Sequence, residues 1–134
     1  MTKIKIKDSL KQSVKALKKA EVEINRPTED VVTLSVCLTA RQSMSSMMRI
    51  FMLSNSINHV DGPSINNLLD QCKTVDKQFE SIDLSKMICK GLSTTECQNK
   101  YCLSIQNVSD CVETANQIKR LVMKKLQFSE SEID

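Results

Sequence analysis

The residues of this chain with the clearest chemical potential are Arg49 and His59, because His59 is the only histidine. A histidine can transfer a proton near neutral pH and an arginine can hold a phosphate oxygen, so such a pair could serve cleavage of RNA. Nine residues separate the two. If both were helical, they would stand about 15 Å apart along the axis and about 80° apart in direction. They therefore cannot hold one phosphate within one chain, and we interpret His59 as a helix C-terminal residue, where positive charge is favourable.

A second arginine, Arg41, lies two helical turns before Arg49, with Ser45 midway between them. These three positions form the one polar stripe of an otherwise apolar segment. Arg41, Arg49 and His59 are accordingly our candidate ligand-binding residues, and we assign no catalytic residue. An enzyme is the less favoured interpretation, since no phosphate-binding glycine loop and no persuasive carboxylate pair is present.

The six cysteines do not have the spacing of a metal site. Structural zinc sites usually take their ligands from close pairs such as C-x2-C, whereas seven, four and eight residues separate the last four cysteines here. We therefore expect reduced, buried thiols, with no metal and no cofactor. A cysteine nucleophile would need a histidine base, and His59 could reach one only through the fold. The cysteines are Cys37, Cys72, Cys89, Cys97, Cys102 and Cys111.

The composition predicts one all-α domain over residues 1–134. Apolar residues make up 40% of the 134 residues, and the chain has only two glycines and two prolines. An all-β fold needs many tight turns, so this scarcity favours a few long helices. We expect a four- to five-helix up-and-down bundle.

The charge distribution is uneven although the net charge is only +3. Residues 1–26 carry seven lysines and one arginine against three acids, whereas residues 128–134 carry three acids and no base. A net charge of this size does not by itself indicate a nucleic-acid-binding protein. The start, "MTKIKIKDSLKQ", lacks the apolar region of a signal peptide, and no stretch approaches the roughly 20 apolar residues of a membrane span. We expect a cytoplasmic protein with no membrane contact.

The periodicity of apolar residues predicts four main helices, over about residues 7–24, 28–58, 65–80 and 109–126, the last starting near Ser109 or one turn earlier. A loop with at most one short helix is expected between the third and the fourth. The core should span about residues 8–126, with an acidic, frayed C-terminal tail at 127–134.

The second helix is apolar on nearly every side between Val31 and Leu53. A surface helix would not tolerate this pattern, so the helix must be central, or have one face in a subunit interface. We expect a homodimer through this helix, in which Met48 and Met52 belong to the interface and Arg41 and Arg49 line its seam.

The order of these segments resembles the HEPN (higher eukaryotes and prokaryotes nucleotide-binding) domain over about residues 8–126. A basic first helix is followed by "LSVCLTARQSMSSMMRIFMLSNSI", "SINNLLDQCKTVDKQFESIDL" and "NVSDCVETANQIKRLVMKKL". The run "TEDVVTLSVC" is similar to an uncharacterised bacterial subgroup of this family. The resemblance implies a four- or five-helix bundle, frequently an antiparallel homodimer.

Many HEPN proteins are metal-independent ribonucleases that use an arginine and a histidine, four to six residues apart, near the start of the last long helix. Here the last helix has Arg120 but no histidine after it, so no catalytic residue carries over. The resemblance favours a non-catalytic interaction or nucleotide-binding accessory module, in a toxin–antitoxin or defence context, with a nucleotidyltransferase as a possible partner. The alternatives are a nonstandard ribonuclease with a site in a dimer cleft, and an RNA-binding adaptor that uses the basic first helix.

Overall fold

The computed structural model describes residues 2–57, 65–85 and 104–133, and within these ranges the chain is helical with no strand. Three helices are long: α1 (Lys3–Ile24), α2 (Thr33–Ser54) and α5 (Ile105–Leu126). Two are shorter, α3 (Ile65–Val75) and α6 (Glu130–Ile133), and the described ranges also contain two 3-10 turns, η1 (Thr28–Asp30) and η2 (Lys77–Ser81). The prediction of an all-α bundle is confirmed.

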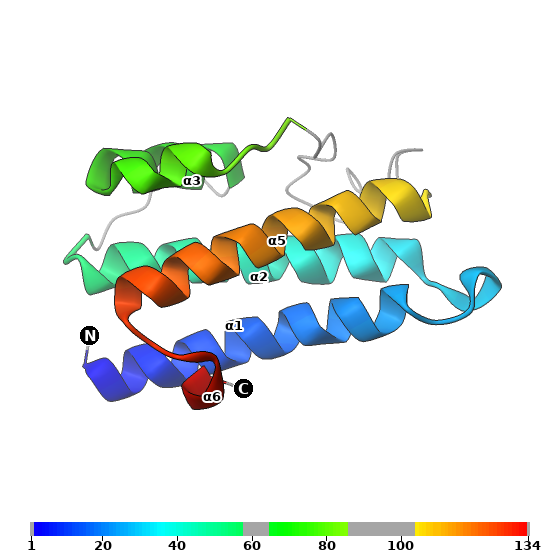
Figure 1. Cartoon of the computed structure of the whole chain (residues 1–134), viewed down its shortest axis with the longest axis horizontal. Helices are drawn as coiled ribbons and strands as arrows, with labels where there is room; N and C mark the ends of the chain where they lie inside the picture. Colours follow the sequence, from blue (N-terminus) through cyan, green and yellow to red (C-terminus); the bar gives the residue numbers. More distant parts are fainter. Residues whose placement is uncertain (1, 58–64, 86–103, 134) are drawn as a thin grey trace.

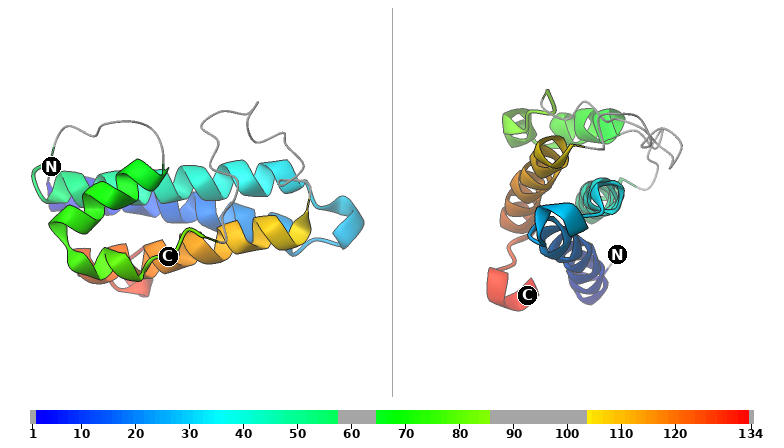
Figure 2. Two further views of the ribbon diagram at one scale, coloured as in Figure 1. Left: turned by 90° about the horizontal axis from the view of Figure 1, so that it is seen from above. Right: turned by 90° about the vertical axis from the view of Figure 1, so that its right-hand side faces the viewer.

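Helix α2 lies at the centre of the bundle and contacts α1, α5 and α3 (Figure 1). Helices α2 and α5 run in the same direction and α1 runs against both, while α3 and η2 cover the other side of the α2–α5 pair (Figure 2). Helix α6 lies against α1. Among the helices that the structure describes, none has the length and apolar content needed to cross a lipid bilayer.

Helix α1 begins at Lys3, four residues earlier than predicted, because Thr2 caps it. The Thr2 hydroxyl accepts a hydrogen bond from the Lys5 backbone N–H at 3.2 Å, which satisfies one of the free donors of the first turn. Leu10, Val14 and Leu17 repeat at helical spacing and are buried, as the periodicity predicts.

Helix α2 is shorter than predicted at both ends. Thr28 starts only a 3-10 turn, and Val31 is extended, so α2 begins at Thr33. A carboxylate oxygen of Glu23 accepts the Val32 backbone N–H at 3.0 Å and holds the extended link against α1. At the other end the positive φ of Ser56, 64°, follows the last helical residue, Ser54.

The third predicted helix, 65–80, is interrupted at Asp76. This residue is extended, with φ −146°, and its carboxylate accepts the Gln78 backbone N–H at 2.9 Å. The chain therefore leaves α3 and continues as η2. Phe79 of η2 is fully buried, and its ring centroid lies 4.6 Å from that of Phe51 on α2.

Helix α5 begins at Ile105, one turn before Ser109, and Ser104 caps it by accepting the Asn107 backbone N–H at 3.4 Å. It ends at Leu126 as predicted. The prediction of a frayed tail, however, is wrong. Gln127 adopts a left-handed conformation, with φ 62°, that turns the chain back toward the core. Phe128 and Ile133 are 7% and 4% exposed and belong to the core.

The methionines of α2 fill the interior of the single chain. Met44, Met47, Met48 and Met52 are all 0% exposed, packed among α1, α3 and α5. The prediction that Met48 and Met52 lie in a dimer interface is therefore wrong, because α1, α3 and α5 already cover these side chains within one chain. Methionine suits this position because its flexible side chain fills irregular gaps.

Candidate functional site

The structure does not bring Arg41 and Arg49 together. Arg41 lies on the inner side of α2 and is 7% exposed, whereas Arg49 lies on the exposed side. Eight residues along one helix correspond to about 12 Å and to directions about 80° apart. His59 lies outside the described residues. Arg41 and Arg49 thus do not form one binding site within the chain.

The three cysteines that the structure describes, Cys37, Cys72 and Cys111, are buried. The Cys72 thiol donates a hydrogen bond to the Met48 backbone carbonyl at 3.8 Å, and burial raises the pKa of this thiol to about 12. It is therefore protonated at neutral pH and a poor nucleophile. No cluster of potential metal ligands occurs within the described ranges. Cys89, Cys97 and Cys102 lie outside them.

A shallow groove of about 270 Å³ lies on the surface where the end of η2 meets α5. Ile82 and Leu121 supply its apolar lining, and polar side chains surround them. We name this the α5 groove, and its lining residues are Ser81, Ile82, Gln117, Arg120, Leu121 and Lys124.

Helical spacing places the polar residues of α5 on the groove. Gln117, Arg120 and Lys124 are three and four residues apart, so they share the outward face of the helix. Ile118 and Val122, on the opposite face, are fully buried and hold α5 in the core. The amphipathic pattern of α5 therefore fixes which side chains can meet a ligand.

Two contacts hold η2 beside α5. Phe79 packs into the core against Phe51, and Asp76 forms an ion pair with Lys125 of α5 at 2.8 Å. The hydrogen bonds from Lys125 and from the Gln78 backbone N–H lower the pKa of the Asp76 carboxyl. These contacts bring Ser81 and Ile82 to the α5 side chains. The Ser81 hydroxyl itself donates to the Gln78 carbonyl at 2.8 Å.

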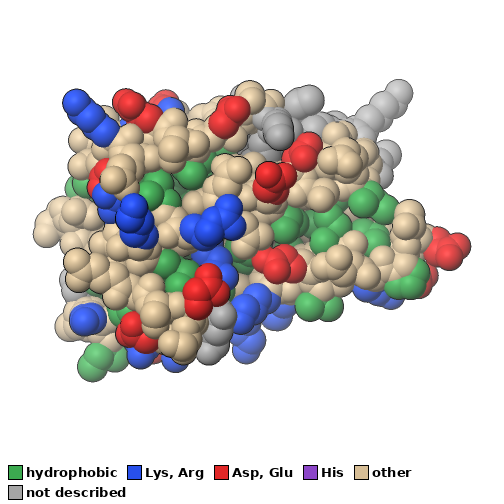
Figure 3. Space-filling view, viewed as in Figure 1, with side chains coloured by type: hydrophobic (Ala, Val, Ile, Leu, Met, Phe, Trp, Pro, Cys, Tyr) green, Lys and Arg blue, Asp and Glu red, His purple; other side chains and the backbone are tan. Residues whose placement is uncertain are grey.

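The groove collects the two basic residues of α5 that form no ion pair among the described residues. Lys119 pairs with Glu130 at 3.9 Å and Lys125 pairs with Asp76, whereas Arg120 and Lys124 form no ion pair within the part of the chain that the structure describes. Figure 3 shows basic side chains gathered over α5 in the middle of this face. Arg120 and Lys124 are therefore exposed cations without an ion pair, although the charge of Lys124 also helps to lower the pKa of the nearby Asp76 carboxyl.

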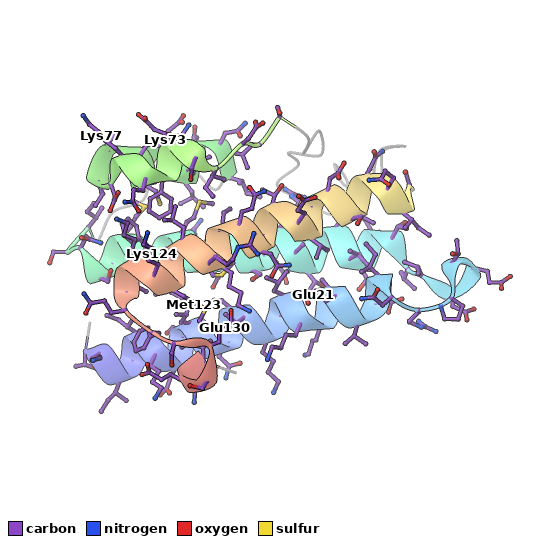
Figure 4. The ribbon with its side chains drawn as sticks, viewed as in Figure 1. Glu21, Lys73, Lys77, Met123, Lys124 and Glu130 are labelled. Carbon is purple, nitrogen blue, oxygen red and sulfur yellow. The ribbon has the colours of Figure 1, made fainter. Side chains whose placement is uncertain are left out.

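Other lysines do not join this site. Lys73 and Lys77 project from the edge of α3 and η2 that faces away from α5, whereas Lys124 lies over α5 itself (Figure 4). Among the described residues, the lining of the groove includes no histidine, cysteine or carboxylate. Guanidinium, ammonium and amide donors beside an apolar floor can bind an oxyanion such as a phosphate, but they supply no general base. The described side chains of the groove therefore suit the binding of an oxyanion.

The α5 groove was not predicted from the sequence. The spacing of Gln117, Arg120 and Lys124 was visible as a polar face of the last helix, but nothing in it distinguishes a binding face from a solvated one. Ser81 and Ile82 come from a segment some forty residues earlier, and only the packing of Phe79 and the Asp76–Lys125 pair brings them there.

Comparisons with protein-family models, with curated proteins and with solved structures found no match to this chain.

Proposed function

We propose that this chain is a non-catalytic, HEPN-like accessory module that binds an anionic ligand of the nucleotide class in the α5 groove. The observation that carries the proposal is the pair Arg120 and Lys124, which form no ion pair among the described residues and flank an apolar floor. Guanidinium and ammonium groups are the usual partners of phosphate oxygens.

The size of the groove limits the part of a nucleotide that it can hold. Small-molecule sites usually measure about 300–1,000 Å³, and this groove of about 270 Å³ is shallow. It suits a monophosphate with part of its sugar or base against Ile82 and Leu121, with the rest of the ligand in solvent or on a partner protein. A module of this kind presents or senses a nucleotide rather than enclosing it.

The wider context follows from the family resemblance. The succession of a basic helix, a long apolar helix, a short third helix and a long last helix supports kinship with HEPN domains. Such a module would work in a toxin–antitoxin or defence system beside a nucleotidyltransferase, whose nucleotide chemistry fits the α5 groove. Co-purification of the tagged chain with a nucleotidyltransferase from its native cell would support this context.

We also propose that the chain forms a homodimer through α2, but with an interface that does not include Met48 and Met52. The exposed stripe of α2 bears Ser35, Gln42 and Arg49, seven residues apart along one side of the helix. Two copies related by a two-fold axis would pair through this stripe, since the other sides of α2 are occupied by α1, α3 and α5.

Calorimetric titration with adenosine monophosphate, and with adenosine as the uncharged reference, tests the nucleotide proposal. The monophosphate should bind more tightly than adenosine, and the Arg120→Ala and Lys124→Ala variants should each weaken binding by about tenfold, the loss expected for one charged hydrogen bond. The double variant Lys73→Ala and Lys77→Ala is the matched control and should bind as the parent chain does. Equal affinity for adenosine and its monophosphate, or an unaffected Arg120→Ala variant, would overturn the proposal.

A further inference from the structure

The outward face of α1 carries a second groove, remote from η2. It measures about 300 Å³ and lies between α1 and α6. Val14 and Ile133 supply its apolar part, and three lysines and a glutamine surround them. We name it the α1 groove, and its lining residues are Lys11, Gln12, Val14, Lys15, Lys18 and Ile133.

Helix α6 shows how an acidic segment can lie on this helix. Ile133 is only 4% exposed, so an aliphatic side chain anchors the segment. Glu132 lies close enough to Lys7 and Lys3 for their charges to lower the pKa of its carboxyl, after the larger effect of its hydrogen bonds from Ser129. Glu130 pairs with Lys119 of α5 at 3.9 Å. An aliphatic side chain with a carboxylate beside it thus packs against the N-terminal end of α1 within the chain itself.

Lys11 and Lys15, which follow Lys7 along α1, continue this basic face. Lys11 and Lys15 are exposed, and neither forms an ion pair within residues 2–57, 65–85 and 104–133. Helical geometry places them on the same side as Ile4 and Val22, which lie seven residues before Lys11 and seven after Lys15. Ile4 and Val22 are 74% and 71% exposed, so the face combines positive charge with apolar side chains.

We propose that the α1 groove docks an acidic, aliphatic segment of a partner protein. One aliphatic side chain of the partner enters between Val14 and Ile133, and its carboxylates lie on Lys11 and Lys15. The apolar floor and the exposed Ile4 and Val22 favour a peptide over a nucleic acid. Proteins that bind single-stranded nucleic acid stack its bases on aromatic side chains. Helix α1 contains no aromatic residue. This inference uses a surface separate from the α5 groove and does not rest on nucleotide binding.

Fluorescence anisotropy with the full chain tests the proposal, using a labelled peptide in which leucines and glutamates alternate as the probe. The double variant Lys11→Glu and Lys15→Glu should weaken binding by about tenfold or more at constant ionic strength. The matched control, Lys5→Glu and Lys19→Glu, makes the same charge change on exposed positions of α1 that do not line the groove. It should reduce affinity by no more than about threefold, because long-range charge alone has a small effect.

Three results would overturn the proposal. The first is an equal loss in the two double variants, which would show general attraction between opposite charges. The second is undiminished binding to a peptide with serine in place of every leucine, or tighter binding of a single-stranded RNA than of the peptide. The third is no measurable binding by the parent chain. Unchanged circular dichroism of both variants is required for each comparison, and the Arg120→Ala variant should bind the peptide normally, which separates this test from that of the α5 groove.

Discussion

Cys72 illustrates at the scale of one residue how burial decides chemistry. Its thiol is fully enclosed and donates to the Met48 carbonyl, and burial raises its pKa to about 12. Only the thiolate reacts with alkylating reagents. We therefore expect Cys72 to resist iodoacetamide in the native chain at pH 8 and to react once the chain is unfolded in urea. Peptide mass mapping of the two samples measures this, and native labelling of Cys72 as complete as in urea would contradict it.

Met48 tests whether the methionines of α2 belong to the interior of one chain. Its side chain is 0% exposed, so Met48→Ala should lower the free energy of unfolding by about 2–5 kcal/mol through lost contacts and a residual cavity. The substitution Lys19→Ala, at an exposed position of α1 away from the proposed dimer seam, should change it by no more than about 0.5 kcal/mol. Urea unfolding curves measure both. Equal effects of the two substitutions would mean that the α2 methionines face a partner instead.

At the scale of elements, the Asp76–Lys125 pair fastens η2 to α5. The pKa of Asp76 is lowered in the folded chain, first by the Lys125 hydrogen bond and then by that from Gln78. Its stabilisation is therefore complete above its unfolded pKa of about 3.9 and is lost as the pH falls through the lower folded value. The unfolding free energies of the parent and Asp76→Asn chains should differ at pH 6, and the difference should shrink as the pH falls below the unfolded pKa of about 3.9.

Urea midpoints at pH 6 and at a series of lower pH values measure this loss. Asp70→Asn is a suitable control, because Asp70 is exposed and lies 3.9 Å from its partner Lys73. Its effect at pH 6 should be smaller than that of Asp76→Asn. A difference for Asp76→Asn that persists unchanged at low pH would show that the carboxylate charge does not fasten η2.

The interiors of the helices were predictable, and so were ends such as Ile24, Ile65 and Leu126, whereas the ends that depend on distant contacts were not. Apolar spacing such as Leu10, Val14 and Leu17 depends only on the local chain, so it identified α1, α2, α3 and α5. The true start of α2 depends on Glu23, which accepts the Val32 N–H from another helix. The break at Asp76 likewise depends on its pairing with Lys125, distant in sequence. Contacts of this kind leave no periodic signal.

At the scale of the whole molecule, self-association depends on how much of the surface of α2 the other helices leave exposed. The sequence could show that α2 is apolar on nearly all sides, but it could not show how many neighbours cover it. With α1, α3 and α5 in place, only the stripe of Ser35, Gln42 and Arg49 remains exposed for a partner.

Sedimentation equilibrium over a range of concentrations measures this self-association. We expect a dimer, and Arg49→Glu should weaken it because the two-fold axis brings both copies of this position to the seam. Met48→Ala, by contrast, should lower the free energy of unfolding of the chain, because Met48 is buried within it. A monomer at every concentration would exclude self-association, and a dimer unaffected by Arg49→Glu would exclude this seam.

The same reasoning applies to binding. The predicted ligand residues Arg41 and Arg49 point to different sides of α2, whereas the α5 groove combines two segments that only the fold brings together. Basic residues could be counted from the sequence. Which of them lack an acidic partner depends on tertiary packing, as the pairs Lys119–Glu130 and Lys125–Asp76 demonstrate.

The most direct test of nucleotide binding in the α5 groove is a titration of the ¹⁵N-labelled chain with adenosine monophosphate, followed by amide chemical shifts. We predict that the largest shifts occur at Ser81, Gln117, Arg120 and Lys124, and that adenosine at the same concentrations leaves these signals in place. Shifts confined to other parts of the chain, or none at saturating monophosphate, would contradict the account.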